Sequence, residues 1–280
     1  MWWKNISKII FISLIATLPF FASCCVHHQN QNPFFGAHTL RKAKTSVVKI
    51  NGHTSIEMIT TSTASEFSMD YRITASGAII NHYKDVSIIL TAAHVCGLIY
   101  DQQISMFDDF VGPEEYIKAI KVNTTLSVTD IEGRTFDALQ IYAQKRSDTC
   151  IIITKRIPQR ALELALEEPA IGEKAWNIGL PHGIWAPNFI PMFDGRFIGH
   201  YHFRFDRSKI SCYSIPAAPG QSGSPIINSF GQVTGMIHSV YKKYNHLSLS
   251  STLEQINHVS KQGMMRLESG YKKYYKDLDK

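Results

Sequence analysis

A serine flanked by glycines carries the strongest chemical signal in this sequence of 280 residues. Residues 220–225 read Gly-Gln-Ser-Gly-Ser-Pro, which places Ser222 in the middle of a flexible stretch. A nucleophilic serine needs an exposed hydroxyl on a tight turn, with free backbone amides nearby to hold a developing oxyanion. Gly220 tolerates positive φ, and Gly223 leaves room for a substrate. We predict that Ser222 is a nucleophile and that the amides of Gly220 and Ser222 form its oxyanion hole; an ordinary Gly/Ser hairpin turn is the alternative.

A general base and an acid that could activate this serine occur earlier in the chain. His94 directly follows an apolar run that ends in Leu-Thr-Ala-Ala, and the small alanines let an imidazole project into a crevice. Asp148 precedes the apolar run Cys150–Ile153, where a carboxylate is costly unless it has a partner. Asp137 is the rival acid, but its strand is less uniformly apolar. The sequence therefore predicts a catalytic set of His94, Asp148 and Ser222.

The elements that must position these residues are short β-strands. Apolar runs broken by turn residues recur in two sets of about six, the first within 45–158 and the second, after a connector, within 159–250. Two such sets with few helices indicate an all-β fold of two six-stranded antiparallel β-barrels. The connector has a short helical pattern at Ala161–Leu166, and residues 251–280 show helical spacing from Leu253, which predicts a C-terminal helix packed on the second barrel, with a basic tail.

The expected strands of the two sets follow in chain order. They are Ser46–Asn51, Ser55–Thr61, Gly77–Asn81, Val86–Thr91, Tyr116–Val122, Phe136–Ala143 and Cys150–Thr154, then Lys174–Gly179, Gly195–Phe203, Lys209–Ile215, Ser224–Asn228, Gln232–His238 and His246–Leu249.

The N-terminus has the features of an export signal. Ile9–Ala22 is an uncharged, mostly apolar run, too short for a bilayer that needs about 20 helical residues but typical of a signal peptide. The following Cys24 completes a string that resembles a bacterial lipoprotein box, with Phe21 where Leu is usual. We expect 1–24 to be a signal peptide with a lipidated Cys24, and 25–44 to be a polar, irregular tether. The protein would then be exported to the periplasm or cell surface and anchored by lipid; an ordinary cleaved signal or an uncleaved anchor is the alternative.

Composition limits the other classes of function. The net charge is +6, but Lys and Arg are scattered, and the densest basic run near the C-terminus favours a solvated tail over a nucleic-acid or membrane patch. We expect no nucleic-acid partner. No CxxC motif or Cys/His spacing indicates a metal, and no cofactor is implied. Cys96, Cys150 and Cys212 allow at most one internal disulfide. Cys96 and Cys150 each lie two residues beyond a predicted catalytic residue, so they form either a disulfide or two buried thiols.

The order His94, Asp148, Ser222, with these flanking residues, resembles the trypsin-like peptidases of the chymotrypsin superfamily, and in style the bacterial HtrA-like and glutamyl-endopeptidase-like members. Asn177–Gly183 resembles the strand and turn that open their second barrel, and Gly231–Ser239 resembles the strand that pairs with substrate. The resemblance implies a chymotrypsin-like fold and a serine endopeptidase that acts on a protein or peptide. In such an enzyme serine attacks the carbonyl, histidine transfers the proton, and aspartate orients the histidine.

The same resemblance implies that Ile237, His238 and Ser239 bind substrate. His238 stands one position later than the histidine that binds an acidic side chain in glutamyl endopeptidases, and a shift by one residue turns a side chain to the other face. Three roles stay open for it: acidic-side-chain binding, a structural histidine near Asp148, or an exposed strand residue. His200 and His202 could also line the specificity pocket, and the preferred substrate sequence is not predicted.

Gln221 departs from the pattern of trypsin-like zymogens, which carry Asp before the nucleophile and pair it with a newly freed N-terminal amine. A glutamine cannot make that ion pair, so we expect no activation switch of this kind. Two other classes of function compete with the endopeptidase. A peptidase-fold binding protein without useful activity is disfavoured by the complete set of three residues. An esterase with the same residues is disfavoured because the strand–GxSxG–helix elbow of α/β-hydrolases is absent.

Overall fold

The computed structural model describes residues 33–60, 66–97, 117–202, 209–241 and 244–278. The expected signal peptide, lipoprotein box and Cys24 lie outside these residues. The chain divides into a first unit that ends at Ala37 and a compact unit that begins at His38. No helix among the described residues is long and apolar enough to cross a membrane.

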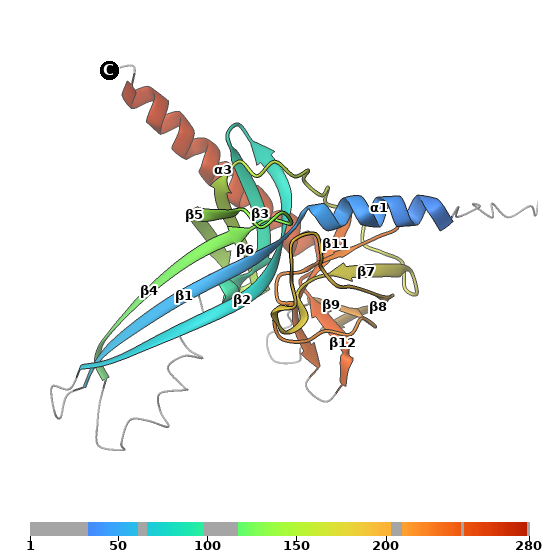
Figure 1. Cartoon of the computed structure of the whole chain (residues 1–280), viewed down its shortest axis with the longest axis horizontal. Helices are drawn as coiled ribbons and strands as arrows, with labels where there is room; N and C mark the ends of the chain where they lie inside the picture. Colours follow the sequence, from blue (N-terminus) through green and yellow to red (C-terminus); the bar gives the residue numbers. More distant parts are fainter. Residues whose placement is uncertain (1–32, 61–65, 98–116, 203–208, 242–243, 279–280) are drawn as a thin grey trace, which may run out of the picture. The chain divides into compact units, whose positions relative to one another are not determined.

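Six antiparallel strands close the first barrel in the order β1-β2-β3-β6-β5-β4 (Figure 1). They are β1 (Val47–Thr60), β2 (Glu66–Tyr83), β3 (Val86–Ala92), β4 (Ile117–Thr129), β5 (Thr135–Gln144) and β6 (Thr149–Lys155). Every residue of β3 is buried, and every residue of β6 except the last is buried. Their β-branched, apolar sequences suit a strand that is covered on both faces. These two strands are therefore the rigid centre from which the neighbouring loops project.

Strands β1, β2 and β4 continue beyond the barrel as a three-stranded ribbon (Figure 1). β3 pairs with β2 only from Ala78 onward, whereas the pairing of β1 with β2 continues to Ile59. The two strands expected at Ser46–Asn51 and Ser55–Thr61 are thus one strand, which corrects the prediction of a break. The strand passes through Gly52 without a break. A glycine fits there because the Ile73 side chain lies over it, and a Cβ would be 2.6 Å from Ile73 Cγ1.

A second closed barrel follows, with the strand order β10-β11-β12-β9-β8-β7. Its strands are β7 (Lys174–Ile178), β8 (Met192–His202), β9 (Lys209–Tyr213), β10 (Pro225–Ile227), β11 (Val233–Tyr241) and β12 (Tyr244–Ser250). Phe197, Tyr213 and Ile226 lie in its buried core. The prediction of two six-stranded antiparallel barrels is confirmed.

The connector between the barrels is extended, and the predicted helical turn at Ala161–Leu166 is wrong. The amide of Leu162 donates to Ile79 O at 2.8 Å, and the amide of Ala165 donates to Val233 O at 2.9 Å. These bonds to strands of both barrels satisfy the connector's backbone, so it has no need of internal helical bonds.

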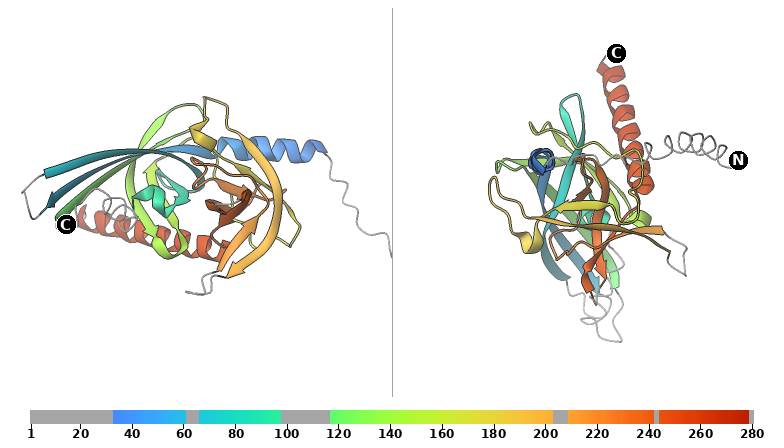
Figure 2. Two further views of the ribbon diagram at one scale, coloured as in Figure 1. Left: turned by 90° about the horizontal axis from the view of Figure 1, so that it is seen from below. Right: turned by 90° about the vertical axis from the view of Figure 1, so that its right-hand side faces the viewer.

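The C-terminal helix α3 (Leu253–Leu278) is present as predicted (Figures 1 and 2). Thr252 Oγ1 accepts from the amide of Gln255 at 3.2 Å, and Gln255 Oε1 accepts from the amide of Thr252 at 2.9 Å. This reciprocal capping begins the helix at the end of β12. Ile256 and Val259 are fully buried, and the helix packs chiefly on β6 of the first barrel, which corrects the expectation that it packs on the second.

A second helix, α1 (Pro33–Thr45), corrects the prediction that residues 25–44 form an irregular tether. Its last part belongs to the compact unit. Ala43 is buried there, and Leu40 packs against the larger apolar core, which contains residues of both barrels. Burial of these apolar side chains gives the segment a reason to order that its polar composition does not show.

A disulfide joins Cys96 to Cys150, while Cys212 is a free, buried cysteine. Cys96 ends the short 3-10 helix η1 (Ala93–Cys96), and Cys150 lies in β6 opposite Thr91 of β3. Of the two alternatives that the sequence left open, the structure has the disulfide. It ties the segment after β3 to the strand beside it.

We expect the double substitution Cys96→Ala/Cys150→Ala to lower the free energy of unfolding by about 2–4 kcal/mol, because a cross-link across 54 residues restricts the unfolded chain. Cys212→Ala is the matched control, because it replaces a buried cysteine that makes no cross-link. Burial raises the pKa of this thiol, so it stays protonated in the folded protein. Urea denaturation of the three proteins measures the difference. Equal midpoints for the double variant and the control would contradict the prediction.

Candidate active site

His94 and Asp148 meet because β3 and β6 are neighbours whose ends are in register. Ala92, the last residue of β3, lies opposite Thr149, the first residue of β6. His94 follows one end in η1, and Asp148 precedes the other. The His94 Nδ1–H donates to Asp148 Oδ2 at 2.8 Å, and the His94 amide donates to Asp148 Oδ1 at 2.9 Å. Both carboxylate oxygens therefore hold the same histidine, and its Nε2 faces away from the aspartate.

Asp148 has a backbone conformation that supports this contact. It follows the 3-10 helix η2 (Lys145–Ser147) with φ +45°, in the left-handed region that non-glycine residues seldom adopt. Its amide donates to Lys145 O and its carbonyl accepts from the Ala93 amide, each at 3.1 Å. The Asp148 side chain is 29% exposed and that of His94 is 25% exposed. Hydrogen bonds on every side of Asp148 thus offset the backbone strain and direct its carboxylate at His94.

Ser222 lies just after a tight turn. The Gln221 amide donates to Ala218 O at 3.1 Å, with Pro219 and Gly220 (φ +94°) at the two central positions. Proline followed by a glycine with positive φ is the signature of a type II turn. Within the described residues, the amides of Gly220 and Ser222 donate to no protein acceptor, whereas those of Gln221 and Gly223 are both engaged. The two amides predicted to form an oxyanion hole are therefore free donors.

The nucleophile turn packs against the strand that leads to His94. Ser222 O accepts from the Ser76 amide at 2.9 Å, and Ser76 O accepts from Thr91 Oγ1 at 2.8 Å. A Cβ on Gly223 would collide with Ser76 O and Thr91 Oγ1, so only glycine lets the turn approach this closely. No hydrogen bond joins His94 to Ser222 in the described part of the chain, as is common in enzymes without substrate. The structure thus brings His94 and Asp148 into contact and places Ser222 against β2, the neighbour of the strand β3 that leads to His94.

Ser76 is a residue of the site that sequence reasoning quoted only as part of a strand. Its buried hydroxyl donates to Gly220 O at 2.8 Å and accepts from the Leu180 amide at 3.0 Å. It therefore joins the first barrel to the nucleophile turn of the second. A serine inside an apolar strand was the available signal, because a buried hydroxyl needs a partner.

His238 lies beside Asp148, which matches the structural reading among the three left open. It is on β11, and its Nδ1 is 3.8 Å from Asp148 Oδ2 and 3.0 Å from Ser239 Oγ. Its side chain is 13% exposed. Burial lowers the pKa of His238, the Asp148 charge raises it, and His94 lowers it further. Burial prevails, so His238 is a neutral imidazole at the edge of the contact between Asp148 and His94.

The other predicted substrate residues have different surroundings. Ile237 is buried, and its backbone holds the nucleophile turn through bonds to Gly223 and Ser224 at 2.7 and 3.0 Å. Ser239 is exposed. His200, on β8, lies with Nδ1 3.3 Å from Ser211 Oγ, and burial lowers its pKa.

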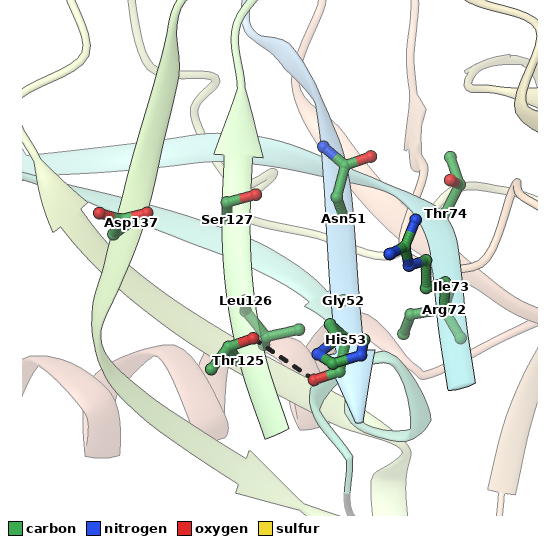
Figure 3. A pocket seen from close by; sticks show the side chains of 10 residues that line it. All are labelled: Asn51, Gly52, His53, Arg72, Ile73, Thr74, Thr125, Leu126, Ser127 and Asp137. Carbon is green, nitrogen blue, oxygen red and sulfur yellow. Dashed lines mark hydrogen bonds between the residues drawn. The ribbon is translucent and has the colours of Figure 1, made fainter. Parts of the chain in front are cut away.

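Asp137, the rival acid, lies elsewhere. It is an exposed residue of β5 opposite Ser127 of β4, and it lines a hollow of about 370 Å³ on the first barrel (Figure 3). Asn51, His53 and Arg72 line the same hollow, and none of the three predicted catalytic residues does. Asp137 therefore has no part in the site around His94. No group of three or more His, Cys, Asp or Glu among the described residues could hold a metal ion.

Comparison with known proteins identifies the family of the chain. Residues 75–236, more than half of the chain, match the family model of the trypsin-like peptidase domain. The protein therefore belongs to the trypsin-like peptidase family, and the expectation of a serine-type peptidase is confirmed at this level. A search of curated proteins finds no match.

Solved structures show the same fold at low sequence identity. The active form of the Rv3671c protease from M. tuberculosis is 17% identical with a TM-score of 0.53, over 79% of this chain and 81% of that one. The HtrA-type protease AlgW with decapeptide is 13% identical with a TM-score of 0.56, over 81% of this chain and 66% of that one. The structural similarity supports the chymotrypsin-like fold. At identities this low it carries no evidence about the reaction, so the chemistry has to be argued from the site itself.

The lowered pKa of His238 predicts a pH-dependent stability. The unfolded chain binds a proton at this histidine near pH 6.5, and the folded protein binds it only at lower pH. The free energy of unfolding should therefore decrease as the pH falls below about 6.5 and stop decreasing below the lowered pKa. His238→Asn removes this contribution, which is at most about 1.4 kcal/mol per pH unit.

Urea titrations between pH 7.5 and 5 measure this effect. The exposed His202 of the same barrel provides a matched control, His202→Asn. Wild type and His202→Asn should lose stability more steeply than His238→Asn. Parallel slopes for all three proteins would show that His238 does not resist protonation.

Proposed function

We propose that this protein is a serine endopeptidase that works through His94, Asp148 and Ser222 and an acyl-enzyme intermediate. One observation carries the proposal. His94 is held by both oxygens of Asp148 with its Nε2 facing away, while the amides of Gly220 and Ser222 stand free on the turn beside it. A base fixed by an acid, next to a serine with unengaged amides, is the arrangement that acyl transfer requires.

The reaction follows from these positions. Ser222 Oγ attacks the scissile carbonyl, and His94 Nε2 takes its proton. Asp148 keeps the other proton on His94 Nδ1 and stabilises the imidazolium that forms. The Gly220 and Ser222 amides hold the oxyanion, each donor contributing about 2.7–4 kcal/mol in comparable enzymes. His94 then protonates the leaving amine. Water next attacks the acyl carbonyl while His94 Nε2 takes its proton, and His94 returns that proton to Ser222 Oγ as the bond from Ser222 to the acyl group breaks.

The substrate class that fits is an extended peptide. The AlgW structure is described with a decapeptide, and this chain shares its fold. Strand β11 pairs with β10 only as far as Met236, and Ile237 then contacts the nucleophile turn. Among the described residues, the part of β11 beyond Ile237 pairs with β12 alone, which leaves its other edge for main-chain pairing with a peptide. A peptidase-fold binding protein without activity and an esterase are the alternatives that the following experiment separates from it.

Labelling by a fluorophosphonate, which reacts with activated serines, tests the proposal. Wild type should label, and Ser222→Ala should not. Ser260→Ala is a matched control, because Ser260 is a buried hydroxyl of α3 that has no hydrogen-bond partner among the described residues; it should label as wild type does. Asp148→Asn should lower kcat on a peptide by about 10⁴-fold, because His94 would adopt the wrong tautomer.

Each other outcome points to a different function. A folded wild type that does not label would favour a binding protein. Labelling together with cleavage of simple esters but not of peptides would favour an esterase. Labelling of Ser222→Ala would place the nucleophile elsewhere and contradict the assignment.

We also propose that the protein is exported and anchored by a lipid on Cys24, on the basis of the apolar run and the lipoprotein-box string that precede this residue. Expression in a bacterium supplied with a labelled fatty acid tests this. Wild type should carry the label and sediment with membranes, and Cys24→Ala should do neither. Cys25→Ala is the neighbouring control and should retain the label. An unlabelled wild-type protein would contradict the anchor, and its presence in the periplasm or medium would leave export by an ordinary signal.

A further inference from the structure

We infer that the buried amide pair of Gln221 and Asn177 positions the oxyanion hole, so that the nucleophile turn is held in its working form without help from a chain terminus. The inference rests on the proposed function. It goes beyond the expectation that Gln221 forms no ion pair with an N-terminal amine, because it assigns the supporting role to two named side chains.

The turn that needs support is Ala218-Pro219-Gly220-Gln221. In a type II turn the central peptide, between Pro219 and Gly220, has one orientation, and its rotation by about 180° gives a type I turn. That rotation would turn the Gly220 amide away from the side on which the Ser222 amide is free. The oxyanion hole therefore exists only while this one peptide keeps its orientation.

Gln221, the last residue of the turn, makes two hydrogen bonds to Ala218, the first residue. Its backbone amide donates to Ala218 O at 3.1 Å, and its side-chain Oε1 accepts from the Ala218 amide at 2.7 Å. Ala218 is thus bound through its amide and its carbonyl to a single residue. This double contact closes the turn around Pro219 and Gly220.

Asn177 holds the glutamine in place. Gln221 Nε2 donates to Asn177 Oδ1 at 2.8 Å, and Asn177 Nδ2 donates to Ser224 Oγ at 2.7 Å and to Pro225 O at 2.9 Å. Ser224 Oγ in turn donates to Gln221 O at 2.6 Å. Asn177 lies on β7 opposite Ile226 of β10, so the strand that begins the barrel provides a rigid base.

The network is buried and fully paired. Asn177 and Ser224 are 0% exposed, Gln221 is 1% exposed, and each amide atom described above has a partner. A buried amide that loses its partner costs about 1–3 kcal/mol, so the network resists any movement of the turn that breaks one of its bonds. A neutral pair does this without burying a charge.

Two hydrogen bonds from other segments hold the carbonyls in the middle of the turn. Pro219 O accepts from the His182 amide at 2.6 Å, and Gly220 O accepts from Ser76 Oγ at 2.8 Å. The His182 contact comes from the short helix η3 (Pro181–Gly183) and holds the carbonyl of the very peptide whose rotation would close the hole. Gln221 and Asn177 thus fix the ends of the turn while η3 and Ser76 fix its middle.

Kinetics per active site test the inference. Gln221→Met keeps the shape of the side chain and removes its hydrogen bonds, and Asn177→Leu removes the partner. The concentration of active sites is first titrated with fluorophosphonate. We then measure kcat and KM for a peptide, and Ki for the corresponding peptide aldehyde. The aldehyde is informative because its adduct with the serine places an oxyanion in the hole. We expect kcat to fall at least tenfold and Ki to rise in parallel, with KM changed less than about threefold; loss of an oxyanion donor costs about 10²–10³-fold in kcat.

Gln159→Met is the matched control. Gln159 is a 9% exposed glutamine whose Nε2 donates to Glu132 Oε1 at 3.1 Å. The same chemical change there should leave kcat per site and Ki unchanged. A role limited to stability would reduce the number of titrated sites in Gln221→Met but leave kcat per site and Ki as in wild type, and that result would overturn the inference. If Gln221→Met does not fold, Asn177→Leu decides in the same way, because it removes the partner of Gln221 Nε2 and leaves Gln221 itself unchanged.

NMR of the Gly220 amide separates this inference from the proposed function. An unreactive wild type would contradict the function, whatever the variants do. The inference would still require a single NMR signal for the Gly220 amide in wild type. In Gln221→Met the same amide should show exchange between two environments. A single environment, identical in both proteins, would overturn it.

Discussion

The pairing of β3 with β6 is the constraint on which the rest of the site depends. Both strands are buried over nearly their whole length, so their register is set by packing on two faces. Ala92 opposite Thr149 is the last pair, and it delivers His94 and Asp148 to the same end of the sheet. A slip by one residue would turn the side chains of the shifted strand to the other face. The Cys96–Cys150 disulfide and the packing of α3 on β6 reinforce this end of the barrel.

The second barrel contributes a turn whose chemistry lies in its backbone. Glycines occur where the chain passes too close for a side chain, at Gly220 against Leu180 O and at Gly223 against Ser76 O. Hydrogen bonds from the side chains of Gln221, Asn177 and Ser224 then stabilise the turn. The pair behind the turn, Gln221 and Asn177, is neutral. A neutral network is formed as the barrel folds, because all its members come from the barrel itself.

The surroundings of Asp148 connect the two barrels electrostatically. His94 approaches from the first barrel and His238 from β11 of the second. Two imidazoles beside one carboxylate cannot both be charged cheaply, and burial keeps His238 neutral. The carboxylate is therefore left to stabilise the charge that develops on His94 during the proposed reaction.

The sequence alone determined the two sets of strands, the glycine-flanked Ser222 and the two residues most suited to assist it. These features are local: a strand shows in its alternation, and a nucleophile turn shows in the few residues that give it backbone freedom. It failed where long-range packing overrides composition, as in the ordered helix α1 and the extended connector at Ala161–Leu166.

Only the tertiary structure decided which side chains meet. Gln221 finds its partner 44 residues earlier in Asn177, His238 turns toward Asp148, and Cys96 and Cys150 form a disulfide where two thiols were equally compatible with the sequence. The partner of a buried polar side chain depends on which strand lies beside its own and in what register. Barrel closure sets that register, and no local pattern contains it.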